Sequence, residues 1–95
     1  MKFVIESYLP VAGADRHAAV AARVRAAAAE LAREGAELRH LECIFVPEDE
    51  LLMVMYEAGS AELVREAGRR AGIACERVLE ATWDDDITTR RRSHE

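Results

Sequence analysis

The chain has little of several residue types, and each shortage excludes a class of protein. Its 95 residues include only 2 cysteines, 2 prolines and 5 glycines. Cys43 and Cys75 lie far apart, so they form neither the CxxC pair of a redox or zinc site nor the dense framework of a secreted scaffold. The glycines at positions 35, 59 and 72 mark helix boundaries and form no phosphate-binding loop. From the cysteines we expect a reduced, cytoplasmic protein.

Long apolar runs and an excess of basic residues are missing as well. The alanine-rich stretch 18–32 is interrupted by Arg23, Arg25 and Glu30, and it falls far short of the roughly 20 apolar residues that a membrane span requires. The first nine residues lack the successive regions of a signal peptide. The net charge of -5 argues against a protein that binds the nucleic-acid backbone. We therefore expect neither a membrane nor a nucleic acid as partner.

The order of the expected elements indicates the fold. The hydrophobic content of 51% and charged content of 33% are typical of one globular domain. Composition and periodicity predict strands over 2–9, 38–46, 51–57 and 77–83, with helices over 15–34 and between Ser60 and Gly72. This βαββαβ order is that of the ferredoxin-like plait, an α+β fold in which two helices lie on one face of a four-stranded antiparallel sheet. We expect the domain to span 1–83, with a flexible, charged C-terminal tail over 84–95.

The alternation along each strand predicts which residues face the helices. The apolar set expected beneath the helices consists of Phe3, Ile5, Leu9, Leu41, Cys43, Phe45, Leu79, Ala81 and Trp83. The third strand is apolar on both sides, which is unusual for a sheet face left in water. We expect a second copy of the chain to cover this face, giving a homodimer in which two sheets stack as a dimeric α+β barrel.

A pocket is expected between the stacked sheets. Its apolar walls and few polar groups suit a small ligand. The residues expected to line it are Val4, Glu6, Tyr8, His40, Glu42, Ile44, Met53, Met55 and Glu80. The same pattern also fits a purely structural dimer interface with its charges at the rim, and the sequence leaves both interpretations open.

His40 is the centre of two chemical hypotheses. His40 and Glu42 alternate with Leu41, so we expect both side chains on one face, where Glu6 and Glu80 are placed to join them. Imidazole with carboxylates suits Ni, Zn, Mn or Fe, although one histidine with scattered glutamates is also common at a solvated sheet edge.

The alternative hypothesis is a cofactor-independent enzyme of the monooxygenase or isomerase type. His40 is then the base, Tyr8 or Tyr56 the donor, and Glu42 or Glu80 the group that orients the ring. This hypothesis rests on fold analogy.

Three segments resemble a family of small bacterial ferredoxin-like domains of unknown function, some of which are described as nickel-binding proteins. They are Phe3–Pro10 (FVIESYLP), Tyr56–Glu62 (YEAGSAE) and Arg69–Ile73 (RRAGI). The resemblance covers the chain to about Trp83 and implies the plait and a homodimer, with metal or small-ligand binding. Ser7 and Tyr8 stand where nickel-associated members carry histidines, so no nickel ligand is transferred by resemblance. Together the residues favour a ligand-binding or metal-binding homodimer over an enzyme.

Overall fold

The computed structural model describes residues 1–10 and 14–82, apart from the side chains of residues 14 and 15. The chain runs in the order β1 (Lys2–Tyr8), α1 (Ala14–Arg33), β2 (Leu38–Val46), a 3-10 turn (Pro47–Asp49), β3 (Leu51–Ala58), α2 (Ala61–Ala71) and β4 (Arg77–Ala81). The strands form one antiparallel sheet in the order β2-β3-β1-β4. This arrangement confirms the predicted ferredoxin-like α+β fold. Trp83 and the predicted tail lie outside the described residues.

The ends of α2 follow from local sequence. Ser60 caps the first turn, because its hydroxyl accepts a hydrogen bond from the backbone N–H of Leu63 at 3.3 Å. Gly72 ends the helix in the left-handed region at φ 75°. The Nε of Arg23 in α1 donates to the carbonyl of Ala71 at 2.9 Å and so ties the two helices together.

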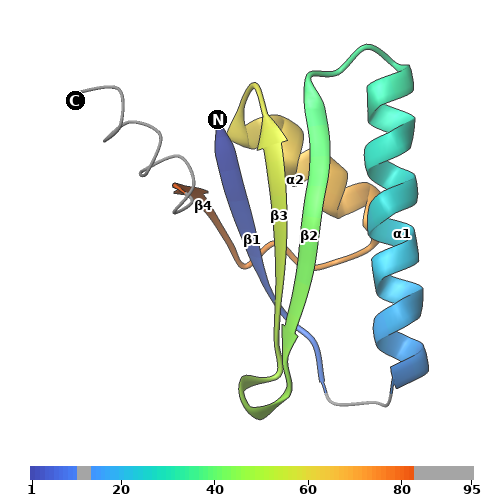
Figure 1. Ribbon diagram of the computed structural model, residues 1–95, viewed down its shortest axis with the longest axis vertical. Coiled ribbons are helices and arrows are strands. Elements are labelled where there is room, and N and C mark those ends of the chain that lie inside the picture. Colours follow the sequence, from blue (N-terminus) through green and yellow to red (C-terminus); the bar gives the residue numbers. More distant parts are fainter. Residues whose placement is uncertain (11–13, 83–95) are drawn as a thin grey trace, which may run out of the picture.

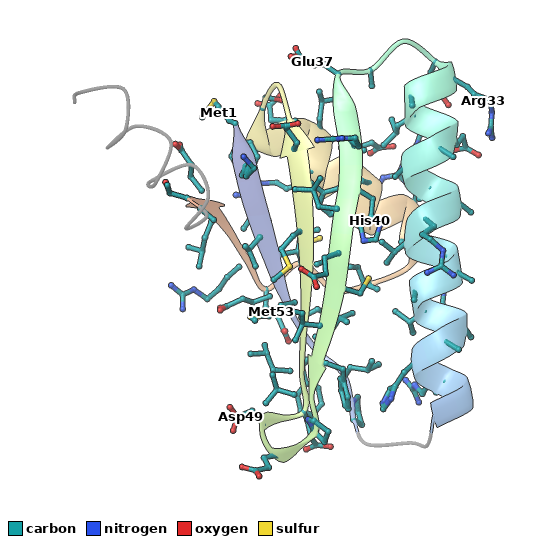
Figure 2. All side chains as sticks on the ribbon, viewed as in Figure 1. Met1, Arg33, Glu37, His40, Asp49 and Met53 are labelled. Carbon is teal, nitrogen blue, oxygen red and sulfur yellow. The ribbon has the colours of Figure 1, made fainter. Side chains whose placement is uncertain are left out.

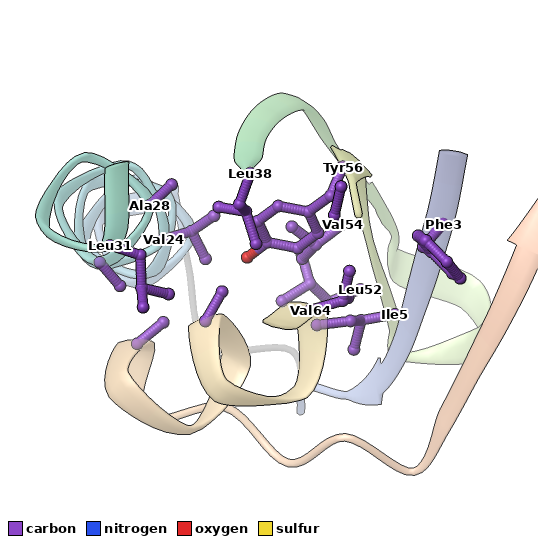
Figure 3. Packing of buried hydrophobic residues seen from close by; sticks show 14 of the residues in the cluster. Phe3, Ile5, Val24, Ala28, Leu31, Leu38, Leu52, Val54, Tyr56 and Val64 are labelled. Atoms are coloured by element: carbon purple, nitrogen blue, oxygen red, sulfur yellow. The ribbon is translucent and has the colours of Figure 1, made fainter. Parts of the chain in front are cut away.

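Both helices lie on one side of the sheet, and α1 runs along the edge strand β2 while α2 crosses behind the sheet (Figure 1). The core fills the space between these layers (Figure 3). Its most completely buried large side chains are Ile5, Val24, Val54, Tyr56 and Val64. We call this side of the sheet the helix-covered face and the opposite side the open face. No helix within residues 1–10 and 14–82 has the length and apolarity needed to cross a membrane.

A bulge in β2 corrects the predicted faces of that strand. His40 pairs with Tyr56 and Glu42 with the next residue, Met55, so Leu41 is an extra residue without a partner on β3. Directly paired residues share a face. Since Tyr56 is completely buried in the core, His40 lies on the helix-covered face, whereas Glu42 lies with Met55 on the open face. The expectation that His40 and Glu42 share one face is wrong.

The register of β4 corrects a second face assignment. Val78 pairs with the buried Ile5, so the helix-covered face receives Val78 and, two residues later, Glu80. Leu79 pairs with Val4 on the open face, where Ala81 also lies. Leu79 and Ala81 are therefore not beneath the helices, and Glu80 does not line the open face. Each of the two alternating sets of residues on β4 contains both apolar and polar side chains. The pairing with β1 decides which set faces the helices.

Candidate functional site

The open face is a continuous apolar surface in the single chain. Cross-strand pairs place Met55 between Glu42 and Val4, and Met53 between Ile44 and Glu6. Figure 2 shows Met53 on the side of the sheet turned away from α2. The apolar residues of this face are Val4, Ile44, Val46, Leu51, Met53, Met55, Leu79 and Ala81.

The neighbours of Met55 already cover it well. Met55 is only 7% exposed although neither helix lies on this face, whereas Leu79 at the edge strand is 37% exposed. The remaining apolar residues of the face are half-buried. A surface of this kind on a small domain is typical of an interaction site.

Paired charges frame the open face. Glu57 lies 2.8 Å from the guanidinium of Arg39 and 3.9 Å from the Lys2 ammonium. Glu6 lies 3.4 Å from Arg77 across the β1–β4 pair. Because Glu6 and Glu57 each have a cationic partner, they are poor candidates for metal ligands. Glu6 is a rim residue whose charge the protein itself balances.

Tyr8 and Glu42 complete the predicted polar set on this face. The Tyr8 hydroxyl donates to a carboxylate oxygen of Glu50 at 3.1 Å, and this hydrogen bond, together with the negative charge of Glu50, raises the pKa of Tyr8. Tyr8 is exposed, beside Leu51 at one end of the face. Glu42 is exposed next to Met55. The structure therefore brings together most of the predicted lining residues, but it separates His40 and Glu80 from them.

His40 has a different set of neighbours from the predicted one. Its Nε2 lies 3.4 Å from the Sγ of Cys43, and its ring contacts Tyr56 edge-on, with ring centroids 5.6 Å apart. Burial lowers the pKa of His40, partly opposed by a hydrogen bond to the backbone of Glu42. Burial also raises the pKa of the Cys43 thiol. The pair therefore favours a neutral imidazole beside a neutral thiol, which is not an activated nucleophile.

The positions of His40 and Glu42 rule out the predicted metal site. The side chains of His40 and Glu42 leave opposite faces of the sheet, so one ion cannot bind both. Among the described residues, no group of three or more His, Cys, Asp or Glu side chains is arranged to hold a metal ion. Of the predicted catalytic set, His40 contacts only Tyr56. Tyr8 and Glu42 lie on the open face, and Glu80 shares the helix-covered face with His40 but lies on β4, at the opposite edge of the sheet.

Two features near α1 were missed by sequence reasoning. His17 is half-buried, and its ring lies tilted against that of Phe45 with centroids 3.8 Å apart. Its Nε2 is buried and has no hydrogen-bond partner within the described part of the chain. Arg25 lines a cavity between α1 and β2 together with His40. The only sequence signal for these contacts is the run of alanines in α1, which leaves space beside the strand.

Comparison with known proteins supports the fold. No protein-family model and no curated protein matches the chain. A solved structure, that of SCO4226 from Streptomyces coelicolor A3(2), is similar with a TM-score of 0.65 over 88% of this chain and 99% of that one. The sequence identity is 16%, so this likeness concerns the fold alone. The resemblance to the nickel-binding family stays a prediction.

Proposed function

We propose that the chain acts as a non-enzymatic homodimer that binds a small organic ligand between two stacked sheets. The observation that carries this proposal is the open face, where eight apolar side chains lie together without a helix over them. Leaving such a surface in water is unfavourable by about 25 cal/mol per Å² of apolar area. A second copy offers the same surface, so a twofold axis buries both at once.

The chemistry of the face favours an organic ligand over a metal. Met53, Met55 and Val4 supply flexible, apolar walls, and Met adapts its shape to irregular ligands. The polar groups lie at the periphery, where Tyr8 presents a hydroxyl and Glu42 an exposed carboxylate. A mostly apolar molecule with one polar end fits this distribution. Nickel or another transition metal is disfavoured, because the open face contains no histidine among the described residues.

Light scattering after size exclusion tests the dimer directly. We expect the wild-type chain to elute with about twice its own mass, and Met53→Lys to elute as a monomer, because stacking then buries an additional charge beside the Glu6–Arg77 pair. Leu79→Lys adds the same charge at a more exposed position of the same face and is expected to weaken the dimer without disturbing the fold. Ala26→Lys, on the exposed side of α1, is the matched control and is expected to stay dimeric.

Native mass spectrometry of the untagged protein tests the ligand. We expect a co-purified organic molecule on the dimer, lost in Met53→Lys, and no rise in melting temperature on addition of nickel. A monomeric wild-type chain refutes the stacked dimer. A dimer that never carries a ligand leaves an interface without the proposed pocket, and a nickel-dependent rise in melting temperature favours the metal.

A further inference from the structure

The cavity between α1 and β2 is lined by positively charged side chains, whereas the chain as a whole has a negative net charge. This seam cavity is a shallow, largely open groove with a volume of about 290 Å³ on the helix-covered side of β2, where Figure 2 places His40. Its lining consists of Arg25, Ala28, Ala29, Ala32, Leu38, Arg39 and His40. Two arginines and no acidic residue line it, although the whole chain carries a net charge of -5.

One of the two arginines is available to a ligand. Arg39 is engaged, since its guanidinium bonds Glu57 at 2.8 Å. Arg25 forms no hydrogen bond or ion pair within residues 1–10 and 14–82, and its side chain is exposed at the cavity. A guanidinium presents a planar fork of donors that matches a carboxylate.

The other walls of the cavity are mostly apolar and favour a ligand with an apolar body. The methyl groups of Ala28, Ala29 and Ala32 form the α1 side, and Leu38 forms part of the β2 side. Because alanine side chains are short, they leave space between α1 and the edge strand β2. His40 contributes an aromatic ring, whose Nε2 lies 3.4 Å from the Sγ of Cys43. The cavity thus combines one cationic group that has no acidic partner among the described residues with apolar walls.

We propose that the seam cavity binds a small carboxylic acid with an aryl or branched alkyl body. The carboxylate pairs with the guanidinium of Arg25, and the body packs on the alanines of α1. This site is distinct from the open face, because Arg25, the alanines of α1 and His40 lie on the helix-covered side of β2, and only Arg39 borders both. The proposal therefore stands or falls independently of the dimer, and the Met53→Lys variant is expected to retain binding at the seam.

Binding is tested by calorimetry on the full chain with two acids, phenylacetate and 3-methylbutanoate, and with their neutral amides as paired controls. We expect the acids to bind and the amides to bind at least about tenfold more weakly, because they lack the charge-assisted bond. Arg25→Gln is expected to weaken the acids by a similar factor. Arg33→Gln, the same charge change on an exposed residue of the same helix, is expected to leave affinity unchanged.

A second variant and a location measurement complete the test. Ala29→Leu fills the cavity from an exposed position of α1, so it is expected to block both acids while the fold is retained. In a nitrogen-15 NMR titration, the acids are expected to shift the amide signals of residues 25–32 and 38–40 rather than those of 51–55. Failure of both acids to bind overturns the proposal. Equal binding of acid and amide, unchanged binding to Arg25→Gln, or shifts confined to β3 also overturn it.

Discussion

Gly68 offers the sharpest test of how α2 packs on the sheet. A Cβ atom at this position would overlap the Sγ of Cys75 and would lie only 3.0 Å from the Cδ1 of Ile5. Ile5 is completely buried at the centre of the core and has no space to move away. Ile5 of the sheet and Cys75 before β4 therefore leave no room for a side chain at this position of the helix.

Two effects of opposite sign decide the stability of Gly68→Ala. Replacing glycine by alanine inside a helix favours folding by about 1 kcal/mol through propensity. Forcing an extra methyl group into a packed site costs about 1–3 kcal/mol. Because the new methyl group meets two neighbours, we expect the packing cost to exceed the propensity gain and the variant to be less stable by about 1–2 kcal/mol.

A double-mutant cycle isolates the cause. Cys75→Ala removes the sulfur atom, so adding Gly68→Ala in that background is expected to change stability by less than about 0.5 kcal/mol, which corresponds to a coupling of about 1–2 kcal/mol. Gly59→Ala, just before the helix, is the control for adding a methyl group beside a flexible neighbour. There the new Cβ meets the end of the exposed Glu37 side chain at 2.9 Å, and this flexible group moves aside.

Urea unfolding followed by circular dichroism measures these differences, with all variants at one protein concentration because the proposed dimer would make stability depend on concentration. The melting temperature offers a second readout, at about 4–8 °C per kcal/mol for a domain of this size. A Gly68→Ala variant more stable than wild type, or a coupling near zero, refutes the close approach of α2 to Cys75 and Ile5.

Two further predictions concern the histidine and one loop. Burial, aided by the charge of Arg25, lowers the pKa of His40, so the fold favours the neutral ring. The stability from this preference is complete above about pH 6.5 and is lost as the pH falls below that value. Urea midpoints at about pH 7 and pH 5 are expected to differ less in His40→Gln than in wild type, and equal differences refute this. Gly35 has φ 92° and open space around its Cα, so Gly35→Ala is expected to cost about 1–2 kcal/mol from backbone strain alone. An unchanged urea midpoint contradicts that reason.

Local sequence was sufficient for the elements and their order. Ser60 and Gly72 act at the ends of α2 through contacts within one or two turns, so their roles are readable without the rest of the chain. The hairpin of β2 and β3 follows from a short polar connection between two apolar segments. Cys43 was also placed correctly among the residues that pack against the core, because its strand neighbours fix its side.

The composition of the candidate site depended on the tertiary structure. Alternation of side chains has a period of two, so a single extra residue gives the segments before and after it opposite assignments. The bulge at Leu41 therefore leaves the predicted faces of residues 42–46 correct and reverses that of His40, and no residue type in this segment indicates a bulge. His40 therefore lies on the helix-covered face and lines the seam cavity together with Arg25, which is 15 residues away in sequence.

The sequence by itself determined which segments become helix or strand, because caps, turns and periodicity act over a few neighbouring residues. Only the tertiary structure decided which side of β4 faces the core. The two parities of Arg77–Ala81 are similarly apolar, and the choice between them was made by the pairing of Val78 with Ile5 and of Leu79 with Val4. Hydrogen bonds to β1, which is distant in the sequence, set that register. The side chains of β4 alone therefore do not determine which of its faces is buried.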